Sequence, residues 1–431
     1  MLQPPISSLS QELLDRVVDH CVQLPERTMY LVTLSLVDRV FTARCTMHIF
    51  EELPLHDSWE SKKKFRTKIE RKFMILKSNP SLARLVRVVD IKITRPQNAH
   101  IFSNSTFLKI VQLLQQHTES SHGIRFQLIG EAISTSDPEQ FTRGLIHSSI
   151  CQTLTTLSLC HLEANVDMFR VCPKLADITL LDVTAGDEVK TPSSAAATNG
   201  VVEPLTIERL NYRTSCEAVN QLIEASRTPS TPIINLSKLR ILKTSPHERK
   251  DMNCVPLLLD MASETLEELY LTTFSTSNIP KESRQFPLRD LVNLQSVTKL
   301  RIFEIFAIIN CKSKNHTTLH DLRAILCTIP SSNKLQRFDL DVSIYGKQPF
   351  QGCLDEDWEG LCAELVRVAA GKLLQFGFFA VVGLKNFNDT RKGHGALYKC
   401  IEDRMRRSFV GHPNITFDPL NIITQGYDDP E

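Results

Sequence analysis

Residue types that commonly do chemistry occur at several places in this sequence, but none of these places holds a complete set. His161 follows Cys160, with Cys172 not far beyond, whereas a structural zinc site needs four ligands at defined spacing. The stretch "AAGKLLQ" lacks the first glycine and the Ser/Thr of a phosphate loop, and "RKGHG" is too brief for a dinucleotide fingerprint. We therefore expect buried core thiols rather than a metal site, and no cofactor.

An acidic turn in "LDEDWEG" is the remaining candidate for acid–base or metal chemistry. Its four carboxylates precede a predicted helix, where negative charge suits the helix dipole, and that structural interpretation is favoured over a catalytic pair. Neither a G-x-S-x-G elbow nor an H-E-x-x-H helix occurs. The sequence thus predicts a protein that is not an enzyme. The acidic residues are Asp355, Glu356, Asp357 and Glu359.

Length and composition indicate the class of protein. A chain of 431 residues is long enough for two or three domains or for one elongated repeat array. Its 50 basic and 49 acidic residues leave a net charge of +1, so we expect neither nucleic acid nor a membrane as partner. With no signal-peptide pattern at the start, no apolar run of ~18–20 residues and no C-x-x-C pair, we expect a soluble intracellular protein with reduced thiols, cytoplasmic and/or nuclear.

A basic stretch lies at residues 57–80 and allows two interpretations. Seven Lys and Arg residues within its positions 62–72 suggest a nuclear-localisation or phosphate-binding segment. However, Phe65, Ile69, Phe73 and Leu76 recur at helical spacing, which favours an amphipathic connecting helix with a solvated basic face. We expect this helix to end at "SNP". The basic residues are Lys62, Lys63, Lys64, Arg66, Lys68, Arg71 and Lys72.

The first 56 residues predict three short helices with more apolar surface than so short a segment can bury alone. "SSLSQELLDRVVDHC" begins with a possible capping box, Ser8 with Gln11, and carries one broad apolar stripe. We expect a second helix that carries Leu31, Leu34 and Val37, and a third that runs through Phe41 and is stopped by Pro54. On pattern alone, a helical cap on a larger domain and a docking module are both open.

The same residues resemble an F-box. The counterparts of its two sub-motifs are "LSQELL" at residues 9–14 and "LSLVDRVF" at residues 34–41, with Ser10 in place of the usual Pro. The resemblance implies a three-helix module that binds the Skp-type linker subunit of cullin–RING ubiquitin ligases, through which it would reach the cullin. It also implies that nine residues face this partner or support that face: Leu9, Ser10, Leu13, Leu14, Val17, Leu31, Leu34, Val37 and Phe41.

From residue 81 to about 380 the chain repeats the pattern L-x-x-L-x-L with apolar substitutions, at intervals of 21 to 38 residues from Leu154 onward. Such a pattern indicates leucine-rich-repeat-like units, each a short strand followed by a return segment, stacked into a curved parallel sheet with helices on the outer face. An ordinary βα-alternating α/β domain is the less favoured alternative. The nine copies are "VRVVDI", "LTTLSL", "LADITL", "IERLNY", "LSKLRI", "LEELYL", "VTKLRI", "LQRFDL" and "LLQFGF".

The repeats are irregular. The Asn or Cys expected eight residues into a unit is replaced by Leu162, Val183, Ser215 and Phe274, so we expect no ladder of side-chain to backbone hydrogen bonds there. Residues 184–204 read as a flexible insertion, because they are small, polar and turn-rich. Residues 381–431 predict a closing helix, then a terminal cap or tail.

An F-box followed by such repeats resembles the substrate receptors of Skp–cullin–F-box ubiquitin ligases, and together with "SNPSLARLVRVVDI" also the large F-box families of mushroom-forming fungi. The resemblance implies an adaptor that holds an unknown target protein on its repeats and makes no bonds itself. A scaffold of F-box and repeats that never joins a ligase is the alternative, and an enzyme on an α/β domain is a distant third.

Overall fold

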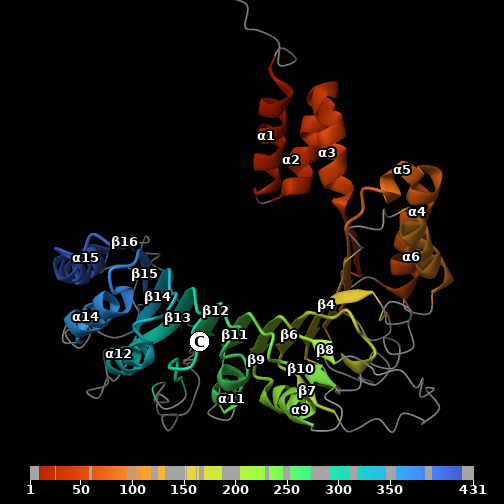
Figure 1. Cartoon of the computed structure of the whole chain (residues 1–431). Helices are drawn as coiled ribbons and strands as arrows, with labels where there is room; N and C mark the ends of the chain where they lie inside the picture. Colours follow the sequence, from red (N-terminus) through yellow and green to blue (C-terminus); the bar gives the residue numbers. More distant parts are fainter. Residues whose placement is uncertain are drawn as a thin grey trace, which may run out of the picture. The chain divides into compact units, whose positions relative to one another are not determined.

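The chain contains α-helices and parallel β-strands, as predicted, and divides into two units (Figure 1). Unit 1 is Met1–Leu175 and unit 2 is Ala176–Glu431. The computed structural model describes residues 9–24, 26–57, 61–94, 98, 101, 104–117, 125–131, 151, 153–161, 163–164, 169–186, 204–228, 233–245, 253–272, 289, 292–310, 318–345, 356–383 and 391–419.

Unit 1 begins with three helices, α1 (Gln11–Val22), α2 (Arg27–Val37) and α3 (Arg39–Glu51). The cap of α1 is Ser10, whose side chain accepts a hydrogen bond from the backbone N–H of Leu13, so the predicted cap at Ser8 is wrong. Asp38 caps α3 in the same way, accepting from the N–H of Val40 at 3.1 Å. Both caps satisfy donors that a helix start leaves without an intrahelical partner.

A parallel sheet follows in unit 1. Helix α3 ends at Glu51, and Pro54, which we expected to stop it, instead lies inside the strand β1 (Glu52–His56) at one edge of this sheet. Proline is tolerated there because an edge strand needs no donor on its outer side. Strands pair in the order β1, β2 (Val88–Ile93), β3 (Arg125–Glu131) and β4 (Leu154–Cys160), and β5 is Glu163–Ala164.

The basic stretch is the helix α4 (Lys62–Ser78), which ends at "SNP" as predicted. It buries Phe65, Ile69 and Leu76 and leaves most of its basic side chains at the surface, so the amphipathic interpretation is confirmed. It packs against α6 (Ser105–His117), and the short α5 (Pro80–Ala83) lies between them in the chain.

Unit 2 adds its strands in sequence order, and each pairs parallel with the next. Because crossovers between parallel strands are right-handed, adding every strand at the same edge places all connecting helices on one face of the sheet. Figure 1 shows these helices along one side of the strands. The strands are β6 (Asp177–Leu181), β9 (Arg209–Arg213), β11 (Ile241–Ser245), β12 (Glu268–Thr272), β13 (Ile302–Asn310), β14 (Arg337–Tyr345), β15 (Leu374–Gly383) and β16 (Ile415–Pro419). The helices are α9 (Cys216–Arg227), α11 (Cys254–Met261), α12 (Thr318–Thr328), α14 (Trp358–Ala369) and α15 (Arg391–Ser408), and the short strands are β7 (Thr184–Ala185), β8 (Leu205–Thr206) and β10 (Ile234–Asn235).

All nine copies of the repeat pattern overlap a strand. In two of them, however, the first residue of the pattern was assigned three residues too early. Strand register aligns Leu242 with Leu210 and Leu269, so that copy begins at Leu239 rather than at Leu236. The copy assigned to Val297 likewise begins at Leu300. The frames were ambiguous because Leu236 and Val297 are themselves buried under the turn that precedes each strand.

Aromatic side chains fill the core where the last strands meet. Phe303, Phe338, Phe376 and Phe417 occupy paired positions on β13 to β16, with successive ring centroids 5.4, 5.7 and 5.4 Å apart. Such rings contribute more than their buried area alone, since offset contacts at this range are attractive. The row joins four strands in one continuous apolar stack.

The segment predicted as a closing helix and a cap adds one more helix and one more strand to the sheet. Helix α15 is the predicted helix, and β16 pairs with β15, with Pro419 at its last position. Residues 187–203 of the predicted insertion lie outside the described residues, as do Leu162, Phe274 and the whole stretch "STSNIPKESRQFP" that follows Phe274.

A side chain bonds to the backbone at one of the four positions where we expected no ladder of such bonds. The Oγ of Ser215 accepts from the N–H of Val183 at 2.9 Å and contacts the carbonyl oxygens of Leu180 at 3.1 Å and Arg213 at 2.7 Å. The Ser215 side chain therefore links the turn after β6 to the turn after β9, in two neighbouring repeats of unit 2. Ser215 is 1% exposed.

None of the helices in the described part of the chain has both the length and the apolar character needed to cross a bilayer.

We predict that Ser215→Ala destabilises the β6–β9 region by about 1–3 kcal/mol, because it leaves the buried N–H of Val183 without an acceptor. Hydrogen exchange of the β6 and β9 amides measures this loss. Ser237→Ala, which removes an exposed hydroxyl bonded only to Asn235, is the control and is expected to change little. Equal effects of the two variants would contradict the role assigned to Ser215.

Candidate partner-binding surface

The three N-terminal helices share a small core of their own. Its buried members come from all three helices, and partly buried Leu34, Val40 and Ile49 pack around them. This core joins the three helices, and its buried part uses only some of their apolar residues. The buried members are Leu14, Val18, Leu31, Phe41 and Cys45.

Many other apolar residues of α1 and α2, and Leu9 just before α1, are exposed. Among the described residues, eight of the twelve exposed large apolar side chains belong to residues 9–37. Such a concentration on a small module marks an interaction surface, whereas single exposed apolar residues need no explanation. The eight are Leu9, Leu13, Val17, Met29, Tyr30, Val32, Leu36 and Val37.

These side chains form a stripe on each helix. Leu13 and Val17 lie one turn apart on α1, with the exposed Leu9 just before its start, while Leu14 and Val18 beside them enter the core. On α2, Met29, Val32 and Leu36 follow the i, i+3, i+7 spacing of one helix face. Leu36 is the most exposed of the eight, at 81%.

The structure divides the nine residues predicted to form or support a partner face. Leu14, Leu31 and Phe41 are buried in the core and so support the surface from beneath, and Leu34 is half-buried against them. The other five are exposed: Leu9, Ser10, Leu13, Val17 and Val37.

Four exposed residues of α2 were missed by the sequence analysis: Met29, Tyr30, Val32 and Leu36. Met29, Val32 and Leu36 follow helical spacing, on a different face of α2 from the buried Leu31. That spacing could have identified these three residues from the sequence.

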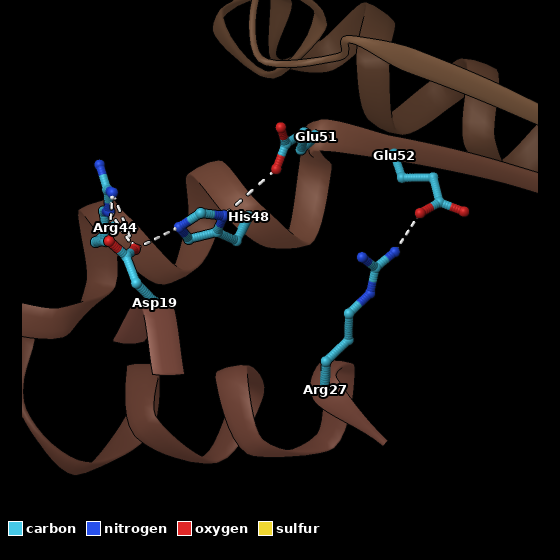
Figure 2. Close-up of polar contacts among 6 residues, drawn as sticks. All are labelled: Asp19, Arg27, Arg44, His48, Glu51 and Glu52. Atoms are coloured by element: carbon cyan, nitrogen blue, oxygen red, sulfur yellow. Dashed lines mark hydrogen bonds and ion pairs between the residues drawn. The ribbon is translucent and has the colours of Figure 1, made fainter. Parts of the chain in front are cut away.

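Polar contacts fix α1 against α3 (Figure 2). The guanidinium of Arg44 donates to both carboxylate oxygens of Asp19 at 2.9 Å. The ring of His48 lies between Asp19, at 3.0 Å from Nε2, and Glu51, at 3.3 Å from Nδ1. A separate ion pair joins Arg27, at the start of α2, to Glu52, where β1 begins.

The hydrogen bond from Arg44 holds the pKa of Asp19 below its ordinary value, against a smaller opposing effect of burial. Asp19 is therefore charged throughout the neutral range, and the charge-assisted contact orients α1 on α3. Because the pair is partly exposed, its contribution to stability is modest.

The chemistry that this arrangement supports is the burial of apolar side chains against another molecule. The described residues include no group of three or more His, Cys, Asp and Glu placed to hold a metal ion. In the acidic turn, Asp357 caps α14 by accepting from the N–H of Gly360 at 2.8 Å, in agreement with the structural interpretation of that stretch.

No family model matches this chain, and comparison with curated protein sequences finds no match either.

We predict that Asp19→Asn lowers the free energy of opening of α1 and α3 by less than about 1 kcal/mol at pH 7. A lowered folded-state pKa stabilises above the ordinary value near 3.8, and this contribution is lost as the pH falls through the folded-state value. The difference between variant and parent is therefore expected to shrink towards pH 3.

Hydrogen exchange of the α1 and α3 amides at pH 7 and at pH 3 tests this expectation. Asp15→Asn is the matched control on the same helix, since Asp15 accepts only from Gln11 within α1. A difference between Asp19→Asn and the parent that persists unchanged at pH 3 would contradict the assignment.

Proposed function

We propose that the N-terminal helices are an F-box that docks on the Skp-type linker subunit of a cullin–RING ubiquitin ligase, and that the later strands and helices form an irregular leucine-rich-repeat array that holds a target protein. The observation that carries the proposal is the pair of exposed apolar stripes on α1 and α2, which lie outside the core that the three helices share.

The exposed stripes support docking on a partner groove. Helices that present apolar anchors at i, i+3, i+4 and i+7 are a common recognition mode, and a few large anchors supply most of the binding energy. Leu13 and Leu36 are such anchors, since their side chains are exposed while their neighbours Leu14 and Leu31 hold the helices together. Ser10, where the F-box pattern has Pro, caps α1 and therefore suits the start of this helix.

The arrangement of unit 2 supports the repeat assignment. Strands are added in sequence order, and β6, β9, β11 and β12 bury alternate residues. One sheet face is therefore turned towards the helices and the other away from them. Backbone hydrogen bonds also join successive repeats just before their strands. The N–H of Arg240 donates to the carbonyl oxygen of Glu208, and the N–H of Glu267 donates to the carbonyl oxygen of Arg240. An open face of this kind offers a long surface to a target.

On this proposal the protein makes and breaks no covalent bonds. It raises the effective concentration of a target lysine near a ubiquitin-conjugating enzyme that the cullin carries, and that effect is geometric.

We predict that the double variant Leu13→Asp, Leu36→Asp loses at least about 100-fold in affinity for the Skp-type linker, because it places two charges in an apolar contact. Both residues are exposed, so the fold is expected to survive, which circular dichroism checks. Calorimetry or co-purification of the full chain with the linker measures the loss.

The matched control is Leu373→Asp, Val410→Asp, which changes two equally apolar side chains of unit 2 that are 78% and 77% exposed. This control is expected to bind the linker as the parent does. If the folded parent chain shows no binding, the ligase proposal is wrong, and the scaffold of F-box and repeats that joins no ligase becomes the favoured function.

A further inference from the structure

The open face of unit 2 gathers carboxylates and aromatic rings on four adjacent strands. Strand register places Tyr270 beside Glu304, and Glu304 beside Asp339. Two residues further along, Asp341 lies between Phe306 and Phe379. The side chains between these positions, such as Phe303 and Ile305, are buried in the core, so the residues named here face away from the helices. We call Tyr270, Glu304, Phe306, Asp339, Asp341 and Phe379 the acidic–aromatic patch.

The carboxylates of the acidic–aromatic patch outnumber the cations beside them. Burial, with the charges of Glu304 and Asp339 adding to it, raises the pKa of Asp341 to about 6. Burial and the charge of Asp339 likewise raise the pKa of Glu304. The nearby cations oppose this only partly: Arg337 pairs with Asp339 at 2.6 Å, and the Nζ of Lys243 lies 4.0 Å from the centroid of the Tyr270 ring. The patch therefore favours additional positive charge.

Asp339 supplies an independent sign of a ligand. It is 6% exposed, and while Oδ2 contacts Arg337, Oδ1 is buried with no hydrogen-bond donor among the described residues. A buried acceptor without a donor costs free energy, so native structures rarely keep one without a reason. Oδ1 lies over Gly377, where an added Cβ would stand only 2.2 Å away, so the glycine makes the space that this oxygen occupies.

The aromatic rings add a second element of recognition. Phe306 and Phe379 are both half-buried and flank Asp341 in the register. Carboxylates bordered by aromatic faces suit guanidinium and ammonium groups, which gain from both the charge and the ring quadrupole. The contact between Lys243 and Tyr270 shows that this surface already accommodates an ammonium group.

We propose that the acidic–aromatic patch binds cationic side chains of a basic polypeptide segment, so that the target held by unit 2 carries exposed arginine or lysine. The inference rests on the proposed function only for the role of unit 2 as the target-binding part, and the binding of a basic segment can be measured without the linker.

The test uses the full chain and a labelled peptide of alternating arginine and glycine, with the same peptide containing citrulline as the uncharged counterpart. We expect saturable binding of the arginine peptide and at least about tenfold weaker binding of the citrulline peptide. The double variant Glu304→Gln, Asp341→Asn is expected to lose about tenfold or more in affinity for the arginine peptide.

A matched control separates the patch from net charge. Glu224→Gln, Glu264→Gln removes two exposed carboxylates in and after the helices of unit 2 and is expected to leave peptide affinity unchanged. Equal loss in both double variants, or equal binding of the citrulline peptide, would overturn the proposal. The variant Leu13→Asp, Leu36→Asp is expected to bind the peptide normally, so a failure of the ligase proposal is distinguishable from a failure of this one.

We also predict that Asp341→Asn raises the melting temperature at pH 7.5, and that the gain disappears below about pH 4. A folded-state pKa raised from 3.8 to about 6 stabilises at low pH, and that contribution is lost as the pH rises through 6, so the uncharged amide is favoured only where the carboxylate is ionised. Thermal melts across this pH range measure it, and a destabilised variant at pH 7.5 would contradict the raised pKa. The charged and titratable groups near Asp341 are Lys243, Glu268, Tyr270, Glu304, Arg337 and Asp339.

Discussion

Each strand of unit 2 leaves an apolar edge that only the next strand and its helix can cover, and the rest of that unit depends on this constraint. A five-residue strand with two inward residues, such as β6 or β12, buries too little surface to be stable alone. Stacking in register turns these small contributions into continuous rows, of which Phe303, Phe338 and Phe376 are the clearest. Because the inward positions are committed to these rows, the outward positions are free to vary, and the acidic–aromatic patch occupies them.

The N-terminal helices follow a different balance. Their core has five buried residues, and the Asp19–Arg44 contact orients α1 on α3 without using apolar surface. Leu13, Leu36 and their neighbours are therefore available for a partner. A module that keeps its own core separate from its exposed anchors can tolerate changes at the anchors, which is why substitutions there are a clean test of binding.

Much of the fold could be predicted from the sequence, because the signals are local. The helical spacing of Phe65, Ile69 and Leu76 identified α4, and the repeat pattern located the strands. The frame at Leu236 failed, since the turn before β11 is as apolar as the strand itself and only register distinguishes them. The acidic–aromatic patch could not be anticipated at all: Tyr270, Glu304 and Asp341 are far apart in sequence and meet only through strand pairing.

The two prolines within β1 and β16 have a further consequence. β1 is an edge strand of the sheet in unit 1, and β16 is one in unit 2, and these strands carry Pro54 and Pro419 respectively. An open strand edge is a template on which a foreign chain can polymerise, and a proline in an edge strand removes one backbone donor that an incoming strand could use. Each of these two edge strands thus carries a residue that discourages another molecule from pairing with it.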